Sequence, residues 1–231
     1  MGPAPADGAL PSSPSSASTA IVFAGGDRPT RHAVLELPDA ALVIAADSGV
    51  EHALALGFHV DLIVGDFDSA EPFAINEAVA AGAEIERHPV AKDATDLELA
   101  LLAARDRGVD DVIVVGGHGG RLDHFLANAL LLVAPALAAL RVRARMGDAE
   151  ITVVRDQAEL NGLPGGLCSL LPTGGPAHGV RTVGLQYPLV HETLTLGSTR
   201  GVSNEFLAPT ATVTLDAGVL LAVVPYFRKD S

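Results

Sequence analysis

Short acidic motifs in the first half of the chain carry the residue types that bind metal ions. Asp66 and Asp68 stand two positions apart in the run Gly-Asp-Phe-Asp-Ser, and Asp47 and Asp93 lie in similar short runs. If residues 65–68 are extended, Asp66 and Asp68 project to the same side. Carboxylates this close repel one another unless protons or cations neutralise them. Oxygen ligands of this kind favour Mg²⁺, which binds through one or two carboxylates plus substrate phosphates.

A second acidic run offers Asp96 in two alternative roles. Thr95 and Asp96 open a predicted helix and Glu98 follows in its first turn. Such residues accept hydrogen bonds from the free backbone N–H groups at a helix N-terminus, and their negative charge complements its positive end. Asp96 could therefore stabilise the helix as readily as it could belong to the metal site.

Glycines and cations beside these motifs could bind phosphate groups. The glycines stand in two runs, Gly25-Gly26 and Gly116–Gly120, which include Gly117, Gly119 and Gly120. They allow backbone N–H groups to approach an anion, and the second run opens a helix whose N-terminus favours negative charge. Lys92 and Arg121 supply the cations that phosphoryl oxygens need.

One helix carries a polar stripe. Arg121, His124 and Asn128 are spaced i, i+3 and i+7 on a segment otherwise rich in Leu and Ala. The stripe is equally compatible with a solvated helix face and with the lining of a site.

Several common catalytic motifs are missing from the sequence. It contains no G-x-x-x-x-G-K-[ST] phosphate loop, no G-x-G-x-x-G after the first strand and no G-x-S-x-G elbow. A predicted metal site, phosphate-binding loops and cations without a covalent nucleophile indicate direct phosphoryl-type transfer, where positioning and electrostatics do most of the catalysis.

Alternating strands and helices must position these residues. Short apolar runs predict strands at 20–24, 42–46, 61–65, 84–88 and 112–116, and apolar spacing predicts helices at 49–56, 71–81, 96–107 and 122–132. This alternation favours a parallel sheet covered by helices. Ligands bind outside the carboxyl ends of such strands, where all the motifs above fall.

The second half of the chain has a different texture. Strands are predicted at 151–154, 167–171, 180–185, 192–196, 210–215 and 219–224, broken by Gly and Pro, with no helix of useful length. We therefore predict an α/β fold class: an N-terminal parallel-sheet α/β domain over 20–145, then a smaller all-β sandwich-like domain over 146–231. Residues 1–19, rich in Pro, Ser and Ala, are predicted to be a disordered tail.

Composition narrows the function classes. The 231 residues carry 15 Lys and Arg against 28 Asp and Glu, a net charge of −13, and they include nine aromatic residues and no Trp. Acidity and scarce aromatic residues disfavour nucleic acid and anionic membranes as partners. The sequence shows no secretory signal and no apolar run of membrane-spanning length, and one Cys fits a reducing compartment. We expect a cytoplasmic protein that acts on a small molecule.

The motifs, taken in order, resemble the thiamine pyrophosphokinase family. The resemblance covers about residues 20–225 and rests on the runs at 46–49, 65–69, 93–101, 116–128, 182–189 and 201–205. It implies a homodimer with active sites near the interface, and transfer of the pyrophosphoryl group of ATP to thiamine, releasing AMP.

The resemblance also implies roles for individual residues. Asp66, Asp68 and Asp93 resemble the Mg²⁺ cluster, with Asp47 nearby and Asp96 and Thr95 beside it. Lys92, Arg121, the glycines and Asn128 would hold ATP, and Asp123 with His124 would line the transfer site. Ser203 and Asn204 resemble the thiamine contact. Some members place a Trp near the thiamine ring, and here Phe206 or Tyr187 would have to supply a stacking face.

Two alternative functions remain open at this stage. A pyrophosphokinase of the same type could act on another alcohol, such as a hydroxymethylpterin, and the Ser203-Asn204 match favours thiamine over it. A non-catalytic nucleotide-binding protein on the same fold would not need the full set of carboxylates, and none is missing here.

Overall fold

The computed structural model describes residues 18–91 and 93–226. The predicted tail therefore lies outside the described residues, except at its end: Thr19 is already the first residue of a strand and is buried. Lys92, a predicted phosphate ligand, also lies outside the described residues.

The first half of the chain alternates strands and helices as predicted, with ends that differ by no more than one residue. The strands are β1 (Thr19–Ala24), β2 (Leu42–Ala46), β3 (Leu62–Gly65), β4 (Glu84–Arg87) and β5 (Asp111–Gly116). The helices are α1 (Gly49–Ala55), α2 (Pro72–Ala80), α3 (Asp96–Asp106) and α4 (Leu122–Leu131), with short 3₁₀ turns η1 (Arg31–Val34) and η2 (Pro135–Leu137).

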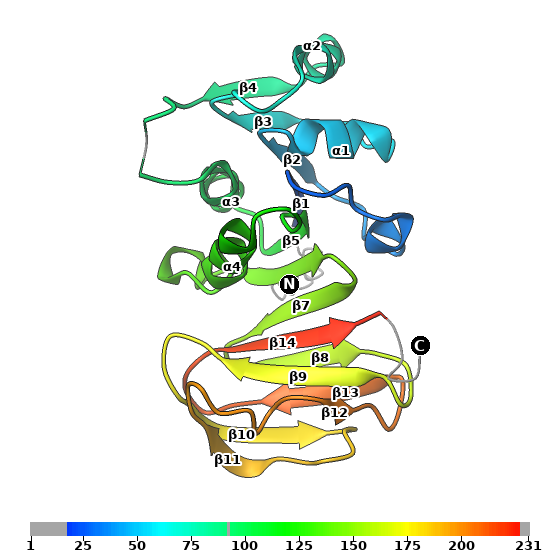
Figure 1. Cartoon of the computed structure of the whole chain (residues 1–231), viewed down its shortest axis with the longest axis vertical. Coiled ribbons are helices and arrows are strands. Elements are labelled where there is room, and N and C mark those ends of the chain that lie inside the picture. Colours follow the sequence, from blue (N-terminus) through cyan, green and yellow to red (C-terminus); the bar gives the residue numbers. More distant parts are fainter. Residues whose placement is uncertain (1–17, 92, 227–231) are drawn as a thin grey trace, which may run out of the picture.

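These strands form a parallel sheet between two layers of helices (Figure 1). On one face, Val22 and Ile44 pack against Leu101 of α3, and on the other, Ile21 and Val43 belong to a cluster with Val50 of α1. β1, β2, β3 and β5 are buried on both faces, which explains their continuous apolar sequences, whereas the edge strand β4 is largely exposed and polar. The order β5-β1-β2-β3-β4 reverses direction between β1 and β5, and this reversal is the point where open α/β sheets bind ligands.

The second half of the chain forms an antiparallel sandwich. The strand β6 (Arg141–Met146) leads into it, and the strands of the sandwich are β7 (Ala149–Val154), β8 (Gln157–Asn161), β9 (Leu167–Pro172), β10 (Ala177–Val183), β11 (Val190–Leu194), β12 (Asn204–Glu205), β13 (Thr210–Thr214) and β14 (Leu220–Pro225). One layer of the sandwich follows the order β12-β9-β14-β7, and the other follows β11-β10-β13-β8. Leu170, Val213 and Phe206 lie in the apolar core of this half. The α/β and sandwich architecture is therefore as predicted.

The two halves share one sheet, which the sequence did not suggest. β6 pairs in parallel with β5 and antiparallel with β7, so ten strands form a single sheet from β12 to β4. The sequence pattern missed β6 because Arg141, Arg143 and Arg145 alternate with its buried Val, Ala and Met residues. It also missed β8, a polar strand at the edge of the second sheet, where few side chains are buried.

Two further observations concern the chain as a whole. None of the helices in the described part of the chain has the length and apolar character needed to cross a bilayer. Cys168 is buried in the sandwich, and burial raises the pKa of its thiol to about 12, so it is chemically quiet.

Candidate active site

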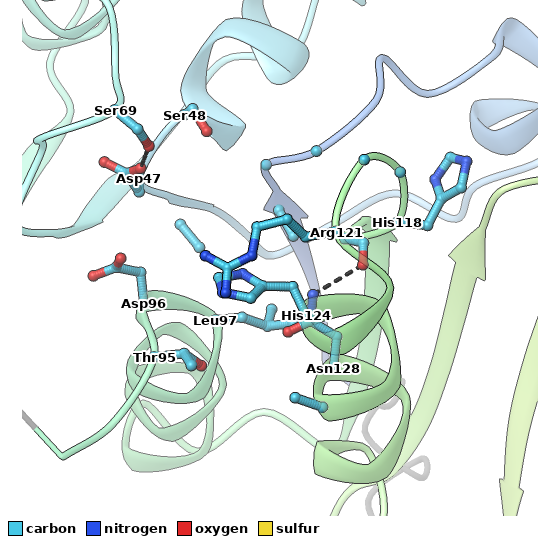
Figure 2. Close-up of a pocket in the computed structure, with 18 of the residues that line it drawn as sticks. Asp47, Ser48, Ser69, Thr95, Asp96, Leu97, His118, Arg121, His124 and Asn128 are labelled. Atoms are coloured by element: carbon cyan, nitrogen blue, oxygen red, sulfur yellow. Dashed lines mark hydrogen bonds between the residues drawn. The ribbon is translucent and has the colours of Figure 1, made fainter.

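A cavity of about 750 Å³ opens at the carboxyl ends of β1, β2 and β5. It lies at the reversal of strand order, where two loops diverge and leave a crevice. Figure 2 shows Asp47 and Asp96 on one side of this cavity and Arg121 and His124 on the other. An acidic wall therefore faces a wall that carries a cation.

Two glycine-containing loops form the floor of the cavity. The Asp27 N–H donates to the His118 carbonyl at 2.8 Å, and the Gly117 N–H donates to the Gly25 carbonyl at 2.9 Å. Gly26 has φ +104° and presses against the His118 carbonyl so closely that a Cβ atom would overlap it. Glycine is therefore required here both by backbone conformation and by space.

A substitution tests this packing. Gly26→Ala should weaken ATP binding at least about tenfold and lower the free energy of unfolding by more than about 1 kcal/mol, because it adds a backbone clash to an unfavourable φ. Isothermal titration with ATP and urea denaturation measure the two effects.

Gly82→Ala is the matched control. Gly82 has φ +112° but open space where its Cβ would stand, and it lies after α2, away from the cavity. This variant should be mildly destabilised and should bind ATP normally. Equal ATP affinities in the two variants would contradict the role given to the loop contact.

The acidic wall brings three carboxylates together. Asp47, Asp66 and Asp68 each offer an oxygen, and these oxygens lie within 4.8 Å of one another. Asp47 is 8% exposed, and its Oδ1 atom has no hydrogen-bond partner among the described residues. A buried carboxylate oxygen without a donor is costly unless a ligand satisfies it. The other oxygen of Asp47 accepts a hydrogen bond from the Ser69 hydroxyl (Figure 2).

The loop after β3 is not extended, contrary to the expectation from sequence. Phe67 has φ +66°, in the left-handed region, and the Asp68 N–H donates to Asp66 Oδ1 at 3.2 Å. The two carboxylates meet because the chain turns at Phe67, rather than through strand alternation. Their proximity raises the pKa of Asp68, with the charge of Asp66 as the largest cause.

The structure separates Asp93 from Asp96. Asp93 is exposed and is not among the residues that line the cavity. Asp96, the first residue of α3, does line it, and its carboxylate lies against Gly65, as Asp47 does. Thr95 caps the helix: its hydroxyl accepts a hydrogen bond from the Glu98 N–H at 3.2 Å. Asp96 therefore does not serve as the N-cap and instead faces the acidic wall.

The polar stripe of α4 lines the opposite wall. Arg121, at the N-cap position, donates to both oxygens of Asp123, at 3.2 Å from Nε and 2.6 Å from the terminal nitrogen. This pairing lowers the pKa of Asp123 to about 2, so the carboxylate stays ionised near neutral pH. Asn128 donates to the Gly117 carbonyl at 2.9 Å and holds the second glycine loop against the helix. Of the two explanations for the stripe, the cavity lining is the one that applies.

The predicted thiamine-side residues lie in the sandwich, away from this cavity. Asn204 is 6% exposed, and its side chain accepts from the Tyr187 N–H at 2.9 Å and donates to the Tyr187 carbonyl at 2.7 Å. It therefore clamps the Tyr187 loop. Ser203 is exposed, has φ +58°, and is held by Ser169, whose hydroxyl accepts from its N–H at 3.1 Å.

The two aromatic residues that could stack on a thiamine ring differ in their exposure to solvent. Phe206 is 2% exposed and its ring packs against Gly162 in the sandwich core. Tyr187 is 54% exposed. Of the two aromatic rings, only that of Tyr187 is therefore open to a ligand, and its backbone is bonded to Asn204, the residue after Ser203.

Sequence reasoning missed several residues of the cavity lining, and three of them have contacts that matter for the site. Ser48 follows β2, Ser69 holds Asp47, and Asp27 contacts the second glycine loop through its carboxylate beside Gly119. Ser48 and Ser69 each follow an aspartate motif, which was the available signal. A hydroxyl that positions a carboxylate has no distinctive sequence pattern of its own.

Comparisons with known proteins agree with this architecture. A thiamine pyrophosphokinase from Bacillus subtilis is 28% identical over 190 residues, which cover 79% of this chain and 86% of that protein. Thiamine pyrophosphokinase 1 from Oryza sativa is 25% identical over 256 residues, covering 96% and 90% of the two chains.

Solved structures give the same result. The crystal structure of the Bacillus subtilis thiamine pyrophosphokinase superposes with a TM-score of 0.80 at 27% identity, covering 91% of this chain and 100% of that one. The thiamin pyrophosphokinase from Candida albicans, at 14% identity, shares the fold with a TM-score of 0.74 and covers 90% and 89% of the two chains.

Two family models match consecutive parts of the chain. Residues 35–144 match the thiamin pyrophosphokinase catalytic domain, which contains the carboxylates and Arg121, and residues 150–220 match the vitamin B1 binding domain of the same enzymes. Together they cover the sandwich with its Ser203-Asn204 loop and the cavity lining except the first glycine loop, which precedes residue 35. The chain therefore belongs to the thiamine pyrophosphokinase family.

Proposed function

We propose that this chain transfers the pyrophosphoryl group of ATP to the hydroxyl of thiamine, giving thiamine diphosphate and AMP. The observation that carries the proposal is the cavity itself, in a chain whose two halves match the catalytic and the vitamin B1 binding models. It combines carboxylates, glycine loops and a cation in the way that phosphoryl transfer requires.

The acidic wall fits Mg²⁺ bound with ATP. Asp47, Asp66 and Asp68 would hold the ion, which is supported by the unpaired, buried Oδ1 of Asp47 and the mutual approach of the three groups. Asp96 stands beside them and is a further candidate, whereas Asp93 lies outside the cluster in which the three carboxylates meet. The ion would neutralise charge on the phosphates as they transfer.

The chain's own groups would orient the triphosphate. The backbone around Gly25, Gly26, Gly117, Gly119 and Gly120 borders the cavity, and the positive end of α4 points toward it. Arg121 now pairs with Asp123, so a phosphate group would draw the guanidinium from that carboxylate or share it. With a pKa of about 2, Asp123 is a poor proton acceptor near neutral pH and is better suited to aligning Arg121. His124 lines the same wall and lies within reach of an acceptor entering the cavity.

Thiamine would bind at the Ser203 loop. Tyr187 offers its exposed ring for stacking, and Asn204 acts indirectly by fixing the backbone of Tyr187. Ser203 remains available for direct contact. This division of roles refines the joint assignment of Ser203 and Asn204 made from sequence.

We further propose that the two half-sites meet across a homodimer. β12 stands five strands from β5 in the shared sheet, about 24 Å at ordinary strand spacing, too far for one thiamine to bridge. α4 exposes an apolar row of Leu122, Leu126 and Leu130, and no residue of this helix is fully buried. Such a row beside the nucleotide cavity suits burial against a second copy.

The alternative functions are less well supported. A pyrophosphokinase for another alcohol would use the same nucleotide wall, but the second half matches a vitamin B1 binding model. A non-catalytic nucleotide-binding protein would not require a cluster of carboxylates whose negative charges repel one another. A cytoplasmic location also remains a proposal, in keeping with the single free Cys168.

One assay tests the function. The purified protein is incubated with ATP and Mg²⁺ plus either thiamine or a hydroxymethylpterin, and AMP and the diphosphate product are separated by chromatography. We expect thiamine diphosphate and AMP in equal amounts. AMP that forms with the hydroxymethylpterin but not with thiamine would favour a pyrophosphokinase for that other alcohol. ATP binding without any release of AMP would favour a non-catalytic nucleotide-binding protein.

A further inference from the structure

Phe67 stands between two proposed metal ligands in a conformation that its own chemistry disfavours. Its φ of +66° lies in the left-handed region, which is rarely populated by bulky side chains. Such residues persist where the surrounding structure holds them. The turn at Phe67 brings Asp66 and Asp68 together, so whatever holds Phe67 also sets the arrangement of these carboxylates.

The end of the neighbouring strand supplies those contacts. Arg87, the last residue of β4, lies in register with Gly65, the last residue of β3. Its guanidinium carbon lies 4.6 Å from the centroid of the Phe67 ring, and one terminal nitrogen donates to the Asp66 carbonyl at 3.2 Å. The next N–H, that of His88, donates to the Gly65 carbonyl at 2.9 Å. Gly65 and the two loop residues that follow it are thus held by Arg87 and His88.

We propose that Arg87 is a positioning residue for metal binding, acting through the Phe67 ring and the Asp66 carbonyl. It is not among the residues that line the nucleotide cavity, and its contacts with Phe67 and Asp66 are both with the loop that carries the proposed ligands. The inference rests on the proposed metal site and names the device that holds two of its ligands.

The chemistry requires arginine rather than any cation. A planar guanidinium can lie over an aromatic ring while an N–H of the same plane donates to a nearby carbonyl. An ammonium group can make either contact but is poorly shaped to make both. A protein with lysine at position 87 should therefore keep part of the contribution that arginine makes to metal affinity. A protein with an uncharged side chain of similar length should keep none of it.

The test compares metal affinity in matched variants of the full chain. Arg87→Met removes the guanidinium and keeps the apolar stem, Arg87→Lys keeps the charge, and Phe67→Leu removes the ring. Arg107→Met is the control, since Arg107 reaches the same strand through Glu84 and Glu86, at 3.6 and 3.9 Å, on the side away from the loop. Binding of Mn²⁺ alone is followed by the EPR signal of the free ion, and turnover is measured as a function of Mg²⁺.

We expect Arg87→Met to weaken Mn²⁺ binding, and to raise the Mg²⁺ concentration for half-maximal turnover, by about tenfold or more. Turnover at saturating Mg²⁺ should fall less than about threefold, because the ligands themselves remain. Arg87→Lys should lie between Arg87→Met and the wild type, and Arg107→Met should match the wild type. Adding Phe67→Leu to Arg87→Met should weaken metal binding little further, because Arg87→Met has already removed the contact between the guanidinium and the Phe67 ring.

Unchanged metal affinity in a folded Arg87→Met protein would overturn the inference and leave the proposed function intact. If that variant does not fold, Phe67→Leu takes its place, with a smaller expected loss, because the hydrogen bond from Arg87 to the Asp66 carbonyl remains. Unchanged metal affinity in a folded Phe67→Leu protein would then overturn the inference. A wild-type protein that makes no thiamine diphosphate would contradict the proposed function instead. A wild-type protein that turns over but binds no Mn²⁺ would contradict the metal site on which this inference rests.

Discussion

Replacing Asp66 by Asn is expected to lower turnover at saturating Mg²⁺ by at least about a hundredfold while leaving the fold as stable as before or more so. Asp68→Asn should behave alike. Each change keeps the side-chain volume but removes one of the negative charges that would hold the ion. Stability should not fall, because the charge of Asp66 raises the pKa of Asp68 and the cluster is repulsive without a cation.

Steady-state assays across a Mg²⁺ series and thermal unfolding measure these two effects. Asp39→Asn is the control, since it makes the same charge change at an exposed position outside the cavity lining. It should leave turnover unchanged within about twofold. Near-normal turnover in either cluster variant would remove Asp66 or Asp68 from the site, and a large loss of stability would indicate that the carboxylate is structural.

Mixing two inactive variants is expected to restore activity if each site draws on two chains. Asp66→Asn disables the nucleotide half, and Tyr187→Ala disables the proposed thiamine half, in the exposed loop that Asn204 clamps. In a mixed dimer, one of the two sites would combine a normal nucleotide half with a normal thiamine half. Random exchange of subunits should then restore about a quarter of wild-type activity.

Subunit exchange is verified with differently tagged copies before the assay, and each variant alone is the baseline. A further variant, Leu126→Glu, places a charge in the exposed apolar row of α4 and should dissociate the dimer in sedimentation velocity. It should weaken thiamine binding more than ATP binding, because the glycine loops and carboxylates come from one half of one chain. Mixed variants that stay inactive despite proven exchange, or a fully active monomer, would place the whole site within one subunit.

The elements that position the nucleotide wall could be predicted from the sequence because their signals are local. Runs such as Leu42–Ala46 are apolar throughout, as buried parallel strands are, and each is followed by Gly or Asp where a loop must turn. Parallel topology then places those loops at one edge of the sheet. Asp47, Asp68 and Arg121 could therefore be assigned to the cavity region before any coordinates, and the ordered motifs pointed to the family.

Other features depended on contacts between residues far apart in the sequence. β6 is recognisable once it is seen between β5 and β7, because its arginines and its buried residues face opposite sides of the shared sheet. Its alternating charges hide it in a search for apolar runs. The same limit applies to β8, where a single Leu160 is buried.

Residue types alone determined which chemistry this chain could perform. The tertiary structure decided which of several residues of the same type lie at the site. Asp93 and Asp96 are equivalent by type, but the start of α3 turns Asp96 toward Gly65 and leaves Asp93 exposed. Phe206 and Tyr187 are equivalent as aromatic faces, but the sandwich core takes the first and the clamp of Asn204 presents the second. Side-chain direction and burial are set by packing among distant segments, and so the sequence could name these candidates without choosing between them.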